Sequence, residues 1–409
     1  MAPFERPRTR MLVVASAALF LSVLVWFNYS AVLPLVVEEW GLSGTRAGVV
    51  FGAFQAGYLL AIVPAGLLVD RHSARHVVAV GATGTGLGSL AFALLADGFL
   101  AGTLFRFLAG VGMAGVYVPG MRFVADWYDE ADRGRAMGLY VGTFSVGSGL
   151  TFLLSSAIAA AVDWRTAVAA TSAGALLVAP LVLLGARDPP DAGSRRAGGL
   201  DLAVLRNRRY LAAVGVYTFH NWELFGVRNW LVAFLLATPA VAATGASGAL
   251  AGALAGTMIL LGGLGNVVGG AASDRFGRLW VVGGALAASG TISLLLGALS
   301  WLPLAALVAV VLGYGVALTA DSAPTSTAVT ELVADERMGA ALSLQSFVGF
   351  SSTVVSPVVF GVALDAGGYA LAFPTLAAGA FLALCFVALL RTLAVRATGG
   401  DAPGAPETS

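Results

Sequence analysis

Residues 270–278 read Gly-Ala-Ala-Ser-Asp-Arg-Phe-Gly-Arg and end a long apolar run. Residues 66–71 read Gly-Leu-Leu-Val-Asp-Arg and end another apolar run 204 positions earlier. Two further polar segments are related by the same offset, because Arg133 and Arg337 also lie 204 positions apart. Landmarks that recur at one offset indicate that the chain contains two copies of one structural unit.

The composition is that of a membrane protein. Hydrophobic residues make up 58% of the chain and charged residues 11%, whereas soluble proteins carry roughly 25% charged residues. The mean hydropathy is +0.87. These values exclude a soluble globular enzyme and a disordered chain, and a net charge of +1 lacks the basic surface of a nucleic-acid binder. The single cysteine, Cys385, lies in an apolar run, so we expect no disulfide and no cysteine-based metal site.

Twelve segments are long and apolar enough to cross a bilayer, which takes about 20 such residues. The first set comprises 11–37, 45–69, 77–96, 100–125, 136–161 and 165–186, and the second comprises 210–237, 247–272, 279–299, 301–330, 339–364 and 369–394. The first segment is too long for a signal peptide, so we expect it to be a retained helix. The predicted fold class is an all-α polytopic membrane protein, with twelve transmembrane helices in two pseudo-symmetric six-helix bundles.

The spans also predict the domain boundaries. An N-terminal bundle over 11–186 and a C-terminal bundle over 210–396 are joined by a polar linker at 187–209. A short tail at 1–10 precedes the bundles, and a disordered tail at 397–409 follows them. In folds built from repeats, the substrate site lies near the midplane at the interface of the repeats.

All 23 basic residues are arginines, and their placement predicts the orientation. With the N-terminus inside, nineteen arginines fall in cytoplasmic segments, and only Arg46 and Arg165 fall at outer ends. Cytoplasmic loops carry such an excess of basic residues. We therefore expect a multi-pass protein of the cell membrane, with the linker and both termini in the cytoplasm.

The repeated segments resemble those of the major facilitator superfamily. Residues 66–71 with Arg75 resemble its G-x-x-x-D-R-x-G-R-R loop, and residues 270–278 are the better-preserved copy. The first copy lacks the central glycine and one arginine of the pattern. Residues 106–112, Arg-Phe-Leu-Ala-Gly-Val-Gly, resemble the superfamily's R-x-x-x-G-x-G motif. The resemblance extends over nearly the whole chain and implies a twelve-helix transporter.

The resemblance also implies a gate on the cytoplasmic side. Asp70 would face the start of the 339–364 span, and Asp274 the start of the 136–161 span, when that side is shut. A helix N-terminus attracts a carboxylate through its free N–H groups and its dipole. The alternative is that the loop arginines serve only as topology determinants. The candidate gating residues are Gly66, Asp70, Arg71, Gly270, Asp274, Arg275, Arg278, Arg133 and Arg337.

The 210–237 span is the most informative membrane segment. One arc of this helix holds Tyr217, His220, Asn221, Glu223 and Arg228. Ionisable residues are costly inside a membrane and are functional candidates by default. Because His220 and Glu223 are three positions apart, they could share a proton, so we expect proton coupling or substrate binding there. The alternative is a structural network in which Glu223 offsets Arg228.

Arg106 and several neutral residues complete the candidate site. By resemblance, Arg106 serves in proton relay or in binding an anionic substrate, and the alternative is a side chain that snorkels to the outer surface. We expect Arg122 and Asp126, four positions apart, to form a structural ion pair. The weaker candidates, which could equally bond between helices, are Asn28, Tyr29, Gln55, Tyr58, Asn266, Asp321 and Gln345.

These features favour a secondary active transporter that moves a small polar solute by alternating access, coupled to protons. The membrane arginines favour an organic or small inorganic anion. The alternative is a drug or metabolite efflux antiporter of the same superfamily, and a membrane receptor or membrane-embedded enzyme is more remote, because no enzymatic motif occurs in the connections. We expect a monomer in the lipid bilayer whose partners are a small-molecule substrate and protons, with no nucleic acid, cofactor or catalytic residues.

Overall fold

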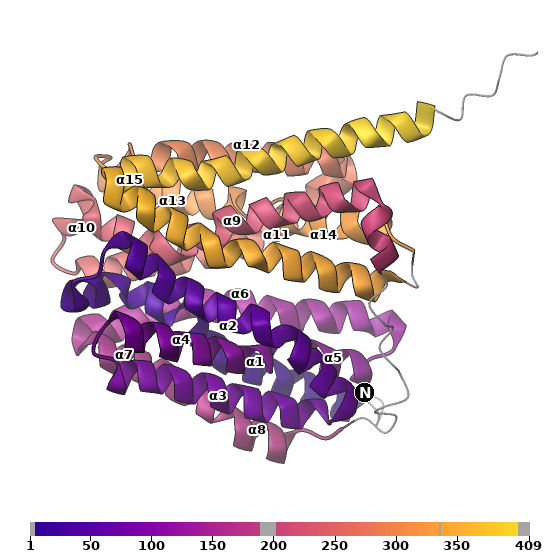
Figure 1. Cartoon of the computed structure of the whole chain (residues 1–409), viewed down its shortest axis with the longest axis horizontal. Helices are drawn as coiled ribbons and strands as arrows, with labels where there is room; N and C mark the ends of the chain where they lie inside the picture. The colour runs from indigo at the N-terminus through magenta and orange to yellow at the C-terminus, as the bar shows by residue number, and fades with distance from the viewer. Residues whose placement is uncertain (1–4, 189–201, 335–336, 400–409) are drawn as a thin grey trace, which may run out of the picture.

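The computed structural model describes residues 5–188, 202–334 and 337–399. The regular elements in these ranges are helices, and they form two groups that follow the order of the chain (Figure 1). Helices from the first half of the sequence lie together on one side, and helices from the second half lie on the other.

Eight helices form the first group. They are α1 (Glu5–Trp40), α2 (Gly44–Arg71), α3 (Ala74–Leu95), α4 (Phe99–Ala114), α5 (Tyr117–Trp127), α6 (Glu130–Ala161), α7 (Trp164–Leu176) and α8 (Val178–Gly185). The second group begins with a short 3-10 helix. Its elements are η1 (Leu202–Arg206), α9 (Arg208–Ala237), α10 (Pro239–Ala242), α11 (Ser247–Phe276), α12 (Arg278–Leu296), α13 (Leu304–Ala317), α14 (Ser322–Glu331) and α15 (Met338–Gly399).

The twelve predicted crossings are present in the described residues. Ten stretches are long and apolar enough to cross a membrane. The last of them, Ala341–Val395, holds two crossings, because Gly367 and Gly368 leave helical geometry and divide α15 into two arms. At Gly368 φ is +67°, which glycine tolerates at little cost. α9 is the twelfth crossing; its 30 residues suffice, but its polar side chains lower its hydropathy.

Three predicted spans are broken just ahead of a proline. α4 gives way to α5 before Pro119, α7 to α8 before Pro180, and α13 to α14 before Pro324. A proline has no N–H, and its ring clashes with the carbonyl four residues earlier, so it kinks or breaks the helix. Pro34 and Pro64 lie inside continuous helices.

The helices extend beyond the predicted spans at both ends of the chain. α1 begins at Glu5 and α15 continues to Gly399, so parts of both predicted tails are helical. Hydropathy marks only the apolar part of a helix, whereas its backbone bonds can continue into water. The predicted linker includes η1 and Asn207, whose side chain caps α9; residues 189–201 of the linker lie outside the described residues.

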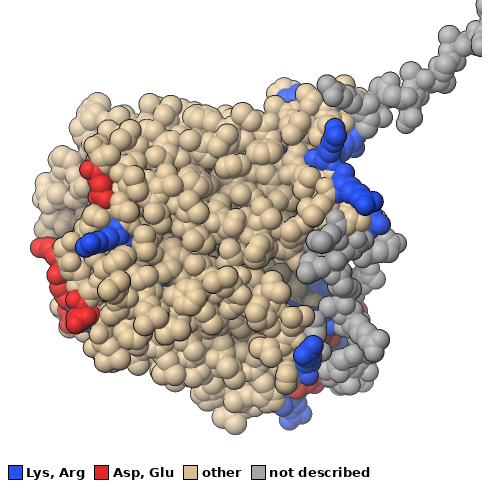
Figure 2. All heavy atoms as spheres, in the orientation of Figure 1, with Lys and Arg blue, Asp and Glu red and all other residues tan. Residues whose placement is uncertain are grey.

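Most charged side chains lie at the two ends of the molecule, on either side of an apolar belt. Figure 2 shows arginines gathered mainly at one end of this belt. α2 ends there with Arg71 and α11 with Arg275, whereas α2 begins at the opposite end, where Gly44 meets Asp365. We call these ends the arginine end and the Asp365 end.

The two halves touch at the Asp365 end. Glycines on α2 face the backbone of the first arm of α15, and a Cβ at Gly44 would lie 2.7 Å from the Gly361 carbonyl oxygen. Such small residues let helix backbones approach closely in membranes. Towards the arginine end, Gly142 of α6 and Gly263 of α11 have open space where a side chain would stand. The halves are therefore packed at one end and separated at the other.

Candidate functional site

An aromatic cluster lies where the two halves meet. The Trp26 ring is centred 4.9 Å from Tyr58 and 5.1 Å from Phe144 in the first half. It is also 6.5 Å from Phe225 of α9 and 6.4 Å from Phe350 of α15. Of these residues only Tyr58 is a sequence candidate, because the others have no ionisable or hydroxyl group to mark them in a membrane span. The sequence does contain one sign of Trp26: a tryptophan recurs at the equivalent position of the second half, since Trp230 lies 204 positions after Trp26.

Arg106 is fully buried inside the first half. Its Nη1 donates to the Val25 carbonyl at 3.0 Å and to Asn28 Oδ1 at 3.2 Å, and its Nη2 donates to the Trp26 carbonyl at 3.1 Å. The guanidinium also lies over the Phe54 ring, 4.5 Å from its centroid. The alternative that Arg106 snorkels to the outer surface is wrong, because two carbonyls of α1 accept its hydrogen bonds inside the bundle.

Asn28 extends this network to other helices of the first half. Its Nδ2 donates to Ser89 Oγ at 3.1 Å and to Thr171 Oγ1 at 3.2 Å. Ser172 Oγ donates to Ser89 Oγ at 2.7 Å. Two sequence candidates, Arg106 and Asn28, therefore form one network that ties α1 to α3, α4 and α7.

Glu223 is fully buried inside the second half. Ser293 Oγ donates to its Oε1 at 2.6 Å, Tyr314 OH donates to the same oxygen at 3.1 Å, and Ser289 Oγ donates to Oε2 at 2.8 Å. The hydroxyls of Ser293 and Tyr314 also bond to each other. The sequence analysis predicted that Glu223 and His220 could share a proton. In the structure Glu223 instead faces α12 and α13, because α9 is oriented with this side chain towards them.

His220 has a different partner. Its Nδ1 lies 2.9 Å from Asp321 Oδ2, an ion-pair contact without hydrogen-bond alignment, and its Nε2 lies 3.1 Å from Ser322 Oγ. Both His220 and Asp321 are buried, and neither carboxylate oxygen of Asp321 has a hydrogen-bond partner among the described residues. Asp321 stands at the break between α13 and α14, so the helix break places a carboxylate in the membrane opposite α9.

Arg228 lies between the two halves with its charge unpaired. It is 7% exposed, and within the described ranges it has no hydrogen-bond or ion-pair partner. Its guanidinium lies over Phe27 of α1 at 5.7 Å and over Phe225 at 5.9 Å. Next to it, Asn229 accepts a bond from Ser30 at 3.1 Å, while its Nδ2 donor is buried without a partner. The structure forms no Glu223–Arg228 pair.

The remaining polar candidates are spread over several contacts. Gln55 Nε2 donates to Thr353 Oγ1 at 2.9 Å and so bridges α2 and α15. Tyr29 OH donates to the Ala47 carbonyl at 3.0 Å, and Asn221 donates to the Tyr217 carbonyl within α9. Gln345 is buried and Asn266 is half-buried. The tertiary structure therefore does not bring all sequence candidates into one site.

The candidate gating residues lie at the arginine end. Asp274 is exposed, as is Arg275, which lies over the Phe276 ring. Arg278 forms an ion pair with Glu331, and Arg133 donates to the Tyr128 carbonyl. Arg71 and Arg337 are exposed, and Gly66 faces open space. A Cβ at Gly270 would lie 4.0 Å from Ala323 of α14, and the side chain of Asp70 lies outside the described residues. The predicted ion pair of Arg122 with Asp126 is present at 3.1 Å.

Asp365 makes a contact between the halves that the sequence did not reveal. Its Oδ1 accepts from the Gly44 N–H at 2.6 Å, and its Oδ2 accepts from the Thr45 N–H at 2.9 Å and from Thr45 Oγ1 at 2.6 Å. The carboxylate thus caps the N-terminus of α2 from the opposite half. In sequence, nothing distinguishes Asp365 from an ordinary loop aspartate.

Comparison with known proteins identifies relatives in sequence and in structure. The family model of the Major Facilitator Superfamily matches residues 15–241. A probable sulfoacetate transporter of Cupriavidus necator is 27% identical over 233 residues, which is 56% of this chain and 54% of the relative. A puromycin resistance protein of Streptomyces alboniger is 32% identical over 217 residues, 52% of this chain and 42% of the relative. The chain thus spans about half the length of the curated relatives it matches.

The fold has relatives over its whole length. A crystal structure of a bacterial homologue of the human lysosomal transporter Spinster, in an inward-facing and occupied conformation, superposes with a TM-score of 0.78. It covers 96% of this chain and 98% of its own at 16% identity, so the likeness concerns the fold alone. The predicted fold class is confirmed by these matches, and they agree with the expectation that the chain is not an enzyme.

Proposed function

The chain belongs to the Major Facilitator Superfamily, and from that premise we propose that it is a secondary active transporter that moves a small anion by alternating access, coupled to protons. The excess of arginine at one end supports placing that end in the cytoplasm. Under this assignment both termini are cytoplasmic, and the separated end of the halves opens inward. The opposite end, closed by Asp365 and the glycine contacts, must open in the other half of the cycle.

The observation that carries the substrate class is the unpaired charge of Arg228. A buried guanidinium without a counter-ion is costly in a membrane, and an anionic substrate would supply the missing partner. Arg106 is a weaker candidate, because its Nη groups already donate to α1 and Asn28. The buried Nδ2 of Asn229 offers a second donor beside Arg228. One matched relative is named for sulfoacetate, which is an anion.

Two buried groups support the coupling to protons. Glu223 is surrounded by hydroxyls, which can accept a hydrogen bond as readily as donate one, so the site can hold the acid in either protonation state. His220 with Asp321 is a second titratable pair. Glu223 and His220 lie on α9 together with Arg228, so proton binding and substrate binding would act on the same helix.

The experiment is uptake by the purified full chain in liposomes. A panel of short carboxylates and sulfonates is offered with and without an inward proton gradient, and Arg228→Gln and Arg228→Lys are compared with the exposed control Arg46→Gln. We expect Arg228→Gln to raise the KM for the transported anion at least about tenfold. The control should have the KM of the parent. Equal uptake by Arg228→Gln refutes the anion site.

Efflux of drugs or metabolites is the second candidate function. The match to a puromycin resistance protein favours it, whereas the unpaired arginine between the halves does not. Everted vesicles separate the two functions. Proton-driven accumulation of puromycin or cationic dyes, together with no transport of the anion panel, would establish efflux instead.

A further inference from the structure

A groove runs along the surface of the second half, between the two arms of α15. The arms diverge towards the arginine end, and α9 lies between them (Figure 1). The groove has a volume of about 280 Å³ and is lined by η1, α9 and both arms. Its walls include Leu211 and Val214 of α9, Leu344 and Val348 of the first arm, and Phe386 of the second.

The groove faces the bilayer rather than the interior of the bundle. Thr218, in its floor, is five positions before Glu223, which places the two side chains about 140° apart around α9. Glu223 points into the bundle, so the groove opens on the other side of the helix. Leu211 is 40% exposed, which gives the groove an open apolar wall.

The two hydroxyl groups in the groove are satisfied internally. Thr218 Oγ1 donates to the Val214 carbonyl at 2.8 Å, and Tyr210 OH donates to the Ala341 carbonyl at 2.7 Å. The groove therefore offers no unpaired hydroxyl to a ligand. A hydrocarbon chain suits such a surface, whereas a polar molecule would lose hydrogen bonds with water on entering it.

Positive charge flanks one end of the groove. Leu205 belongs to the lining, and close to it in the chain Arg206 ends η1 and Arg208 begins α9, both with exposed side chains. Arg209 Nη2 donates to the Leu393 carbonyl at 3.1 Å and ties α9 to the second arm at the same end. Figure 2 shows this concentration of basic side chains at the arginine end of the apolar belt.

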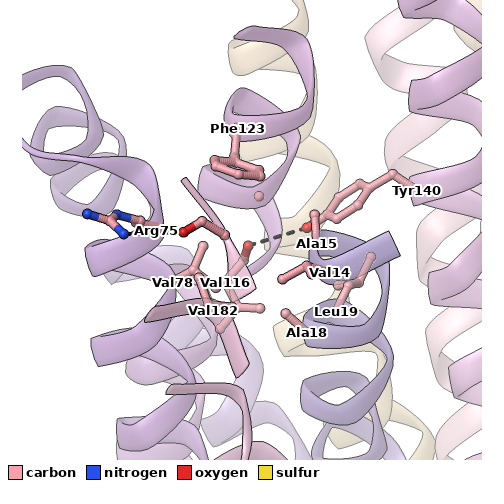
Figure 3. A pocket seen from close by; sticks show the side chains of 12 residues that line it. Val14, Ala15, Ala18, Leu19, Arg75, Val78, Val116, Phe123, Tyr140 and Val182 are labelled. Atoms are coloured by element: carbon pink, nitrogen blue, oxygen red, sulfur yellow. Dashed lines mark hydrogen bonds between the residues drawn. The ribbon is translucent and has the colours of Figure 1, made fainter. Parts of the chain in front are cut away.

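The first half has no such groove at its equivalent positions. Val14, Tyr140 and Val182, which lie 204 positions before Thr218, Leu344 and Phe386, line an enclosed apolar space of about 10 Å³ instead (Figure 3). Tyr140 belongs to the lining of this space, and its hydroxyl donates to the Tyr117 carbonyl at 3.1 Å. The groove is thus a property of the second half and not of the repeated fold.

We propose that this groove binds one acyl chain of an anionic phospholipid whose phosphate is held by Arg206 and Arg208. The apolar walls and the flanking arginines match the two parts of such a lipid, and basic pockets between transmembrane helices bind anionic headgroups. The lipid chain would lie between the two arms of α15, in contact with α9.

The test is native mass spectrometry of the full chain with added phosphatidylglycerol or phosphatidylcholine of identical acyl chains. We expect one phosphatidylglycerol to be retained in preference to phosphatidylcholine, and Arg206→Gln/Arg208→Gln to weaken its binding about thirtyfold. The matched control, Arg10→Gln/Arg135→Gln, removes two exposed arginines of the first half that also lie at the arginine end. It should bind phosphatidylglycerol as the parent does.

A second variant tests the acyl site without changing the charge. Thr218→Phe fills the groove and should displace phosphatidylglycerol, whereas Leu94→Trp, at an exposed position on α3, should not. Equal retention of both lipids by the parent, unchanged binding to the double arginine variant, or unchanged binding to Thr218→Phe would each overturn the proposal. No retention at all, as expected if another part of the chain fills the groove, would also overturn it.

Discussion

Two serines at equivalent positions of the two halves have opposite hydrogen-bonding roles. Ser89 and Ser293 are 204 positions apart. In the first half, Ser89 accepts from Asn28 in the network around a buried cation, Arg106. In the second half, Ser293 donates to a buried anion, Glu223. The equivalent serines therefore belong to networks around buried charges of opposite sign, Arg106 in the first half and Glu223 in the second.

The partners of these charges differ in what they can exchange. Arg106 donates to two backbone carbonyls, which can only accept and are fixed in the helix. Glu223 is held by three hydroxyls, whose hydrogens rotate and which can donate or accept. The cation network can only hold a shape, whereas the anion network can tolerate a change in protonation. We therefore expect substitution of Arg106 to lower stability, and substitution of Glu223 to impair the coupling of transport to protons.

The largest effect is predicted for Arg106→Gln. The change removes the charge-assisted bonds that tie α4 to the Val25 and Trp26 carbonyls and to Asn28 of α1, so we expect a loss of about 3–5 kcal/mol in the free energy of unfolding. Thermal unfolding of the purified variant measures this, with the exposed Arg46→Gln as the control. A variant of parental stability that fails only in transport would break the comparison.

Glu223→Gln should spare stability and abolish coupling. The amide can satisfy the three hydroxyls, so we expect unfolding within about 1 kcal/mol of the parent. Because the amide cannot take up a proton, transport driven by a pH gradient should fall to the level without a gradient, while counterflow exchange persists. The exposed Glu38→Gln is the matched control. Undiminished proton-driven transport would remove Glu223 from the coupling mechanism.

His220 and Asp321 should behave as a unit. If their contact is functional, the effects of His220→Gln and Asp321→Asn on the transport rate will not add, and the double variant will be little worse than the worse single one. The expected interaction energy is about 0.5–3 kcal/mol. Transport rates of the parent, the two single variants and the double variant, measured across a pH series, give the double-mutant cycle. Strictly additive effects would show that the two residues act independently.

The smallest effect concerns Asp365, which makes one of the contacts between the halves. Asp365→Asn weakens the cap on α2, so we expect the outward-open population to rise about fivefold, or about 1 kcal/mol. Spin labels at positions 46 and 371, in a Cys385→Ser background, report the separation of the halves. Asp163→Asn is the control, because Asp163 caps α7 at Thr166 within one half. Equal distance distributions in the parent and Asp365→Asn would exclude a latch at Asp365.

The sequence by itself determined the crossings, the repeat, the family and the concentration of arginine at one end. These features depend on local hydropathy and on a fixed offset, and both can be counted along the chain. The Arg122–Asp126 pair was also predictable, because its members are one helical turn apart.

Only the tertiary structure decided which partners the buried charges have. Ser293 is 70 residues from Glu223, Ser322 is 102 residues from His220, and Thr45 is 320 residues from Asp365. Such pairs depend on how each helix is rotated and how far it is shifted against its neighbour, and composition sets neither quantity. That is why the sequence identified Glu223, His220 and Arg228 as candidates, and why packing between helices assigned them to three separate environments.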